Sequence, residues 1–148
     1  MENAPIRIIL ADDDEGDRFL FKEALEELKI KSFVHTVNDG IQLMEYLNDK
    51  DTPVPHLLFL DLNMPRKNGL ECLKEIRNNA KLKDISIAIY STSASEKDMD
   101  ETFLNGANVY IKKPNDFNIL KQALDKVVTA VYLYQAPPFN RANFLLRI

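Results

Sequence analysis

The sequence predicts an α/β fold, a flavodoxin-like, doubly wound (βα)5 domain whose five parallel strands take the order 2-1-3-4-5. Short runs of large apolar residues alternate along the 148-residue chain with segments whose apolar residues recur at helical spacing. The run Leu57–Leu60 is apolar at every position, which is typical of a strand buried on both faces of a parallel sheet. Each crossover between parallel strands carries a helix, and the alternation supplies those helices.

Five segments are predicted to be strands, because each is short, rich in large apolar residues and ended by polar residues, glycine or proline. They are Ile6–Ala11, Ser32–Val37, the apolar run that ends before Asp61, Ile85–Ser91 and Asn108–Ile111.

Five helices are predicted where the apolar residues of a segment form one stripe. They lie at about Glu15–Lys29, from Asn38–Gly40 through Leu47, around Leu70–Ile76, at Glu96–Asn105 and from near Asp116 onward. An exposed loop, Asn48–Pro55, separates the second helix from the third strand.

We expect one domain over residues 5–129, followed by a helix extension and tail over residues 130–148. The tail holds four aromatic residues, two arginines and no acidic residue, a composition that does not favour solvated disorder. Two arrangements remain open: the tail packs back on its own domain, or it forms a homodimer together with the last helix. We favour the homodimer, because exposed apolar segments usually mark interfaces.

Composition excludes several classes of protein. The net charge of −4 argues against a surface that coats nucleic acid. The single cysteine, Cys72, has no partner for an internal disulfide, which favours a reducing compartment. No apolar segment approaches the roughly 18 residues of a membrane span, and the N-terminus lacks the pattern of a signal peptide. We therefore expect a cytoplasmic protein.

Polar side chains stand at the carboxyl ends of four predicted strands: Asp12 and Asp13, Asp61, Ser91, and Lys113. The carboxyl ends of parallel strands meet at one edge of a sheet, so these residues should share a cleft. Three neighbouring carboxylates require a compensating cation, and oxygen ligands of this kind suit Mg²⁺. With a lysine and a hydroxyl nearby, the cleft could hold a tetrahedral oxyanion, and Asp61 could act as the nucleophile of a phosphoryl transfer.

The chain resembles the receiver domains of bacterial two-component response regulators. The resemblance covers about Ile6 to Thr129 and rests on four pieces in order. They are Leu10–Asp13, Leu60–Pro65 with Gly69, Ser91 at the end of the fourth strand, and Tyr110–Pro114. Within that family the sequence resembles the single-domain regulators that partner bacterial phytochromes. This closer resemblance rests on the acidic segment Asp12–Asp17, the loop Asn48–Pro55 and Tyr90–Ser93.

The resemblance implies a role for each matched residue around the phosphate. Asp61 would accept the phosphoryl group of a sensor histidine kinase's phosphohistidine. Ser91 would be the switch hydroxyl, and Thr92 would line the phosphate pocket beside it. Lys113 would pair with the phosphate, and Pro114, after a cis peptide bond, would place that lysine.

The resemblance also implies a metal site and a switch residue. Asp13 and Asp61 would bind Mg²⁺ directly together with the main-chain carbonyl of Asn63, while Asp12 would act mainly through water. Tyr110 would be the switch aromatic, inward or outward according to phosphorylation. Such a protein is a phospho-acceptor, with only its own metal-dependent phosphorylation and dephosphorylation as chemistry.

Simpler readings compete with these roles. Asp12 and Asp13 could cap the first helix, although the other pieces favour metal binding. Asp14, Glu15 and Asp17 are expected to be cap and solvent charges, and Lys112 a surface lysine.

Two other classes of protein compete with a phospho-acceptor: an aspartyl-phosphate hydrolase and an adaptor. Aspartyl-phosphate hydrolases need a second acidic residue two positions after the nucleophile, where this chain has Asn63. An adaptor that binds partners without being phosphorylated would not need the full set of site residues.

Overall fold

The computed structural model describes residues 4–134 and 145–146. In the described residues strands and helices alternate as the sequence predicts. The strands are β1 (Ile6–Ala11), β2 (Ser32–Val37), β3 (Leu57–Leu60), β4 (Ser86–Ser91), β5 (Val109–Lys112) and β6 (Leu145–Leu146). The helices are α1 (Glu15–Glu26), α2 (Gly40–Asn48), α3 (Gly69–Arg77), α4 (Glu96–Leu104) and α5 (Phe117–Tyr134).

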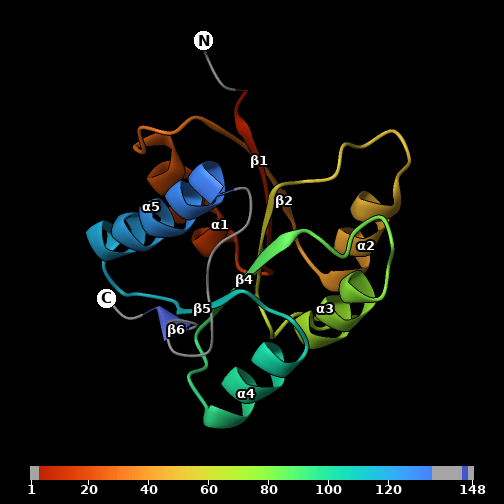
Figure 1. Cartoon of the computed structure of the whole chain (residues 1–148). Helices are drawn as coiled ribbons and strands as arrows, with labels where there is room; N and C mark the ends of the chain where they lie inside the picture. The colour runs from red at the N-terminus through yellow and green to blue at the C-terminus, as the bar shows by residue number, and fades with distance from the viewer. Residues whose placement is uncertain (1–3, 135–144, 147–148) are drawn as a thin grey trace.

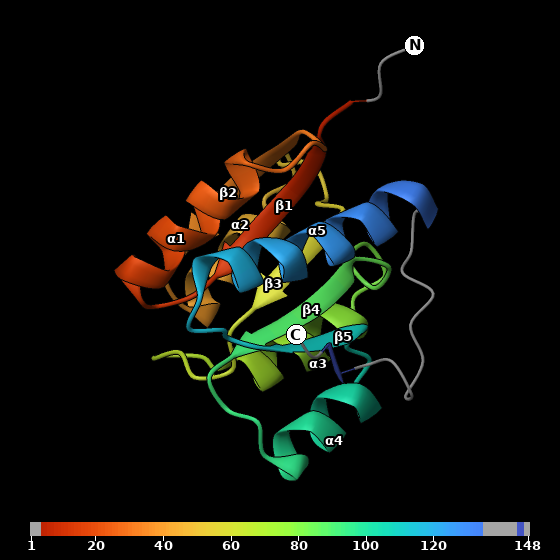
Figure 2. The same cartoon turned by 90° about the vertical axis from the view of Figure 1, so that its left-hand side faces the viewer.

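The strands form one parallel sheet in the order β2-β1-β3-β4-β5-β6. The first five strands of that order confirm the predicted 2-1-3-4-5 topology. The helices cover both faces: α1 and α5 lie on one side, and α2, α3 and α4 on the other (Figure 1). Figure 2 shows α1 and α5 crossing in front of the central strands.

Successive side chains of the central strands point to opposite faces of the sheet and pack into two separate hydrophobic cores. In β3, Leu58 and Leu60 join the core under α2 and α3, whereas Leu57 and Phe59 join the core under α1 and α5. Phe21 of α1 anchors the second core by packing edge-to-face on Phe59, with the ring centroids 4.8 Å apart. Because both faces of every central strand are covered, the polar chemistry is confined to the ends of the strands.

Two details of the prediction need correction. Helix α1 ends at Glu26 rather than Lys29, because the N–H of Glu27 turns back to the carbonyls of Ala24 and Leu25. No cis peptide bond occurs among the described residues, so the cis bond predicted before Pro114 is wrong. A cis X–Pro bond costs about 0.5–1 kcal/mol, and Lys113 reaches its partners with the bond in the trans form.

The sheet has one strand more than predicted. Leu145 and Leu146 pair in parallel with Tyr110 and Ile111, so β6 covers the edge of β5 in the same chain. This pairing is the fold-back arrangement of the two considered for the tail, although residues 135–144 and 147–148 lie outside the described part. Within that part, no helix is long and apolar enough to cross a membrane.

Arg77, the last residue of α3, is hydrogen-bonded to the loop between α3 and β4 and to the loop between α4 and β5. Its guanidinium donates to the carbonyls of Lys83, Ile85 and Gly106 at 2.8, 2.7 and 2.9 Å. It also donates to the side chain of Asn108 at 3.1 Å. A glycine suits position 106 because its φ is +97° and a Cβ there would press on the Arg77 side chain.

Replacing Arg77 with methionine should lower the free energy of unfolding by about 2–3 kcal/mol, since several half-buried acceptors lose a charged donor. Urea denaturation monitored by circular dichroism measures the change. Lys74→Met, which removes a positive charge from the exposed face of the same helix, should change it by less than about 0.5 kcal/mol. Equal losses in the two variants would contradict this account of Arg77.

Candidate functional site

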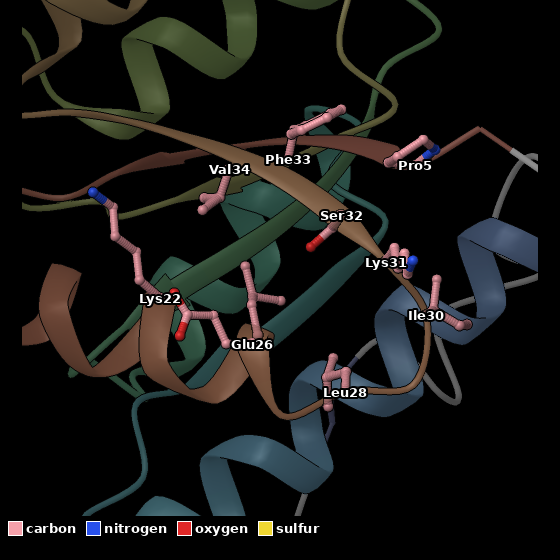
Figure 3. Close-up of a pocket in the computed structure, with 10 residues that line it drawn as sticks. Pro5, Lys22, Glu26, Leu28, Ile30, Lys31, Ser32, Phe33 and Val34 are labelled. Atoms are coloured by element: carbon pink, nitrogen blue, oxygen red, sulfur yellow. The ribbon is translucent and has the colours of Figure 1, made fainter.

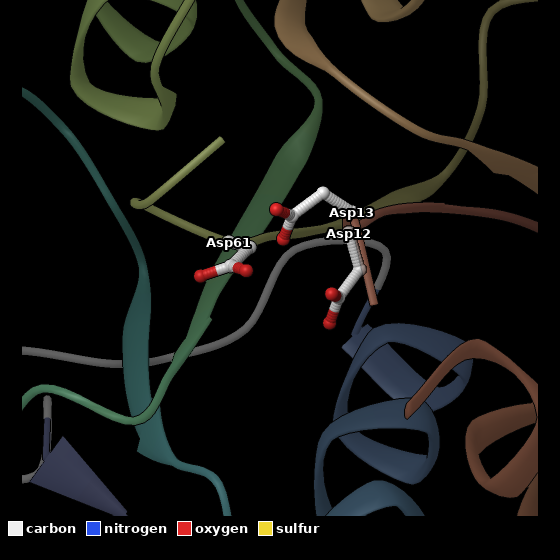
Figure 4. Close-up of side chains that lie close together, drawn as sticks. All are labelled: Asp12, Asp13 and Asp61. Carbon is white, nitrogen blue, oxygen red and sulfur yellow. The ribbon is translucent and has the colours of Figure 1, made fainter. Parts of the chain in front are cut away.

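Three carboxylates meet at the carboxyl edge of the sheet. Asp12 and Asp13 follow β1, Asp61 follows β3, and each presents an oxygen within 4.8 Å of the others (Figure 4). Asp12 is fully buried and Asp61 is 5% exposed, whereas Asp13 faces solvent. The cluster therefore has a buried floor and an open mouth.

Backbone contacts fix the two buried carboxylates. The N–H of Asp12 donates to the carbonyl of Val37, and that of Asp61 donates to the carbonyl of Ala11. Both residues thus continue the strand pairing by one step. Gly69 packs directly on Asp61, since a Cβ at position 69 would lie 2.2 Å from the Asp61 carbonyl oxygen. The start of α3 consequently holds the loop that carries Asp61.

Lys113 enters the same cleft from the end of β5. Its Nζ lies 2.8 Å from an oxygen of Asp12, 2.8 Å from one of Asp17 and 3.5 Å from one of Asp61. Its main-chain N–H donates to the carbonyl of Ser91 at 2.8 Å, which aligns the ends of β4 and β5. Lys112 is exposed, as predicted.

The environment shifts the pKa of each buried charge. Burial raises the pKa of Asp61 from 3.8 to about 6, against the opposing influence of Lys113. Burial also raises the pKa of Asp12, although Lys113 and the Asp14 N–H lower it. Burial acts to lower the pKa of Lys113, but its contacts with Asp12 and Asp17 outweigh this and raise that pKa. The cleft therefore favours a charged lysine and disfavours ionised carboxylates.

Ser91 lies fully buried at the end of β4, where its hydroxyl oxygen accepts the N–H of Ser93 at 3.2 Å. The Ser93 hydroxyl donates to Asp98 of α4 at 2.6 Å. The ring of Tyr110 is fully buried, and its hydroxyl donates to the carbonyl of Ser93 at 2.8 Å. These bonds connect the edge of the cleft to α4, whose N-cap is Ser95.

Two predicted site residues lie at the rim. Thr92 follows Ser91 and is exposed. Asn63 is also exposed, and its N–H donates to Asp61 at 3.3 Å. Their predicted parts in holding phosphate and metal stay predictions.

Asp17 is the residue that sequence reasoning missed. We expected a solvent charge, but its carboxylate pairs with Lys113, a residue 96 positions away. Asp14 does act as the N-cap of α1, as expected, by accepting the N–H of Asp17. The sequence held no signal for the Asp17 contact, because an acidic residue in the first turn of a helix is common for other reasons.

The carboxylate cluster fits a hard divalent cation. It supplies oxygen ligands only, and one buried oxygen of Asp12 has an ion pair with Lys113 but no hydrogen bond. Asp12, Asp13 and Asp61 would hold such an ion, whose charge would offset their mutual repulsion.

A second hollow lies between the end of α1 and the edge strand β2 (Figure 3). Lys22, Glu26 and Lys31 stand at its rim and apolar residues such as Val34 line it. It does not include the carboxylate cluster, and no group of metal-ligating side chains was found there among the described residues. We assign it no role.

Comparison with known proteins identifies the family. Residues 8–125 match the response regulator receiver domain. Response regulator Rcp1 of Synechocystis sp. is 33% identical over 122 residues, which are 80% of this chain and 83% of that protein.

Solved structures agree. The phosphorylated cyanobacterial phytochrome response regulator RcpA has a TM-score of 0.80 and 34% identity, covering 90% of this chain and 97% of that one. The Mn²⁺-bound form of Rcp1 has a TM-score of 0.78 and 30% identity, covering 88% and 96%. With its parallel sheet, its carboxylate cluster and a family match over most of its length, the chain belongs to the response regulator receiver domains, which are signalling proteins.

Proposed function

We propose that this chain works as a single-domain response regulator, phosphorylated on Asp61 by a sensor histidine kinase. The observation that carries the proposal is the placement of Asp61. Its carboxylate is nearly buried, 3.5 Å from the Lys113 ammonium, and beside two further carboxylates suited to a metal. This is the arrangement that a phosphoryl group needs: a nucleophile, a cation and a metal site.

The transfer step forms one bond and breaks another. A carboxylate oxygen of Asp61 bonds to phosphorus while the bond from phosphorus to the donor's imidazole nitrogen breaks. The electron pair of that bond stays on the nitrogen, which takes a proton. No separate base is needed, because the ionised carboxylate is already the nucleophile.

Three residues would contact the phosphoryl group once it is bound to Asp61. Lys113 would move the short distance from its present partners to a phosphoryl oxygen. The Ser91 hydroxyl, now an acceptor for the Ser93 N–H, keeps its own proton to donate to a second oxygen. Thr92 would contact the group from the exposed rim.

Mg²⁺ is the proposed metal. Receiver domains bind divalent metal at their acidic pocket, and the related Rcp1 is known in a Mn²⁺-bound form. Asp13, Asp61 and the main-chain carbonyl of Asn63 would be direct ligands, and Asp12 a ligand through water. The ion would offset charge on the phosphoryl oxygens, the chemistry that Mg²⁺ supplies in phosphoryl transfer.

Phosphorylation would be communicated to partners by a change in the surface formed by α4, β5 and α5. Ser93 is hydrogen-bonded to Asp98 and to Tyr110, so a shift of Ser91 toward phosphate would pull on both. Tyr110 would act as the switch aromatic, and it is inward in the present structure. We infer that phosphorylation changes the partner surface formed by these elements.

The kinase partner must reach Asp61 through the mouth of the cleft. Helix α1, which begins two residues after Asp13, exposes Phe19 (57%) and Leu20 (47%), two large apolar side chains suited to a protein surface. The relative RcpA, a phytochrome response regulator, supports a sensor of the phytochrome type, and we propose a bacteriophytochrome kinase in the cytoplasm.

We retain the homodimer as a proposal. Leu104 of α4 is 79% exposed and Leu133 of α5 is 60% exposed, on the two helices nearest the β5–β6 edge (Figure 1). A second copy would cover these leucines, and the pairing of β6 with β5 could form between copies as well as within one. The receiver domain, residues 5–129, would then hold the site, and residues 130–148 the dimerisation element.

Incubation with Mg²⁺ and acetyl phosphate should add one phosphoryl group to the wild-type protein, because a small donor bypasses the kinase. Intact mass detects the gain. Asp61→Asn should gain nothing, and EDTA should abolish the gain in the wild type. An unmodified wild-type protein would favour the phosphorylation-independent adaptor instead.

Removing the Asp61 charge should stabilise the metal-free protein. The pKa of about 6 in the folded protein lies above the ordinary 3.8, so the folded state binds more protons between these values. Ionisation of Asp61 therefore lowers the free energy of unfolding. The loss is absent below about pH 4, where Asp61 is protonated, and complete above about pH 7. In EDTA, the free energy of unfolding of Asp61→Asn should exceed that of the wild type by about 2 kcal/mol at pH 7.5 and should be almost the same at pH 4.

Urea denaturation measures this gain. Glu23→Gln, on the exposed face of α1, should change stability little at either pH. Mg²⁺ should stabilise the wild type more than Asp61→Asn, because binding to the folded state adds stability. A loss of stability in Asp61→Asn at pH 7.5 would contradict the prediction.

Truncation after Tyr134 should turn the proposed dimer into a monomer that still accepts phosphate, because most of the proposed dimerisation element is lost while α5 and the carboxylate cluster remain. Light scattering coupled to size exclusion gives the mass. If the full chain and the shortened chain both run as monomers, or both as dimers, the proposed role of the tail is wrong.

A further inference from the structure

We propose that Asp17 is a positioning residue of the phosphorylation site: its carboxylate competes with the phosphoryl group on Asp61 for the Lys113 ammonium. The inference rests on the proposed function, in which Asp61 is the phospho-acceptor. It adds a residue from α1, outside the strand ends that build the rest of the cleft.

The distances show how Lys113 is shared in the resting protein. Its Nζ is 2.8 Å from Asp17 and 2.8 Å from Asp12, but 3.5 Å from Asp61. Only 9% of the lysine side chain is exposed. A buried ammonium has three protons to donate, and here its two shortest contacts lead away from the nucleophile.

The simplest alternative role for Asp17 is helix capping, and the local hydrogen bonds argue against it. Asp17 stands three residues after the N-cap Asp14, where an acidic side chain can close a capping box by accepting the N-cap N–H. That N–H instead donates to Asp12 at 2.9 Å. The Asp17 carboxylate is thus not used by its own helix and points to Lys113.

The Asp17 backbone is nevertheless held firmly. Its N–H donates to the Asp14 side chain at 2.8 Å, and the next residue, Arg18, donates from its guanidinium to the Asp12 carbonyl. The carboxylate therefore cannot follow Lys113 far when a phosphoryl group attracts the ammonium. Asp17 must give up part of its contact, and its negative charge also repels the incoming group.

The test uses beryllofluoride, which mimics a phosphoryl group on a carboxylate, with the full-length protein at saturating Mg²⁺. Fluorine NMR counts the bound anion during the titration. Asp17→Asn should lower the dissociation constant roughly threefold to tenfold, because one competing charge is removed. Asp17→Glu, which keeps the charge within reach of the lysine, should bind close to the wild-type level.

Glu15→Gln is the matched control. It removes the same charge from the same turn of α1, but Glu15 is exposed and has no recorded contact with Lys113 among the described residues. An equal gain in affinity in Glu15→Gln and Asp17→Asn would show that the gain comes from the lower net negative charge and not from the Asp17–Lys113 contact, and it would overturn the proposal. Unchanged or weaker binding in Asp17→Asn would overturn it as well.

A readout without metal or anion tests the contact itself. The proton–nitrogen NMR signal of the Lys113 ammonium is assigned by its loss in Lys113→Gln. In the resting protein, the ammonium protons should exchange with water several-fold faster in Asp17→Asn than in the wild type. The exchange rate should be unchanged in Glu15→Gln, and an unchanged rate in Asp17→Asn would overturn the proposal. Absence of any bound beryllofluoride in the wild type would instead refute phosphorylation at Asp61, with which the inference falls.

Discussion

The ion pairs of one buried lysine hold the site together. Lys113 meets carboxylates that follow β1 and β3 and one that lies in α1, and its main chain is bonded to the end of β4. Without the ammonium, Asp12 and Asp61 would be adjacent buried anions, which a protein interior tolerates only when a cation or proton compensates them. Tyr90, whose ring centroid is 5.3 Å from the ammonium, closes the apolar side of its pocket. Through its side chain and its main chain, this one residue therefore links the polar ends of four strands and a helix, and the two apolar cores bring those ends together.

The same burial gives Asp61, the proposed phospho-acceptor, a raised pKa and makes its negative charge unfavourable. A carboxylate with a pKa of about 6 is ionised at neutral pH, yet its surroundings disfavour the charge. In the proposed function, a bound cation would relieve that cost, and so would a movement of Lys113 toward Asp61. A ligand that compensates this charge therefore binds the folded state more favourably, while the protein without that ligand is less stable. Such a loss of stability at a binding site is common. Gly69 adds to the constraint, because its close approach leaves the loop after Asp61 no room to relax.

The sequence predicted the fold well because the patterns that define it are local. Apolar runs and helical stripes gave each element, and the parallel topology brought Asp12, Asp61 and Lys113 to one edge. What failed depends on contacts between distant segments. Nothing near Asp17 in the chain indicates its partner, and the two residues of β6 are too few to form a pattern. The cis bond before Pro114 came from the resemblance alone, and no local physical constraint required it.

Helix α4 is the element best placed to respond to the site. It buries only Met99 and Thr102 among its residues, so apolar packing holds it less firmly than the other helices. Its first turn is instead attached by polar contacts, in which Ser93 donates to Asp98 and accepts from Tyr110. The N–H of the same Ser93 reaches the hydroxyl of Ser91. A displacement of Ser91 by less than the length of a hydrogen bond would disturb both attachments at once. Polar contacts of this kind break and re-form at little cost compared with a packed core, so in the proposed function a small electrostatic change at Asp61 would be enough to displace α4.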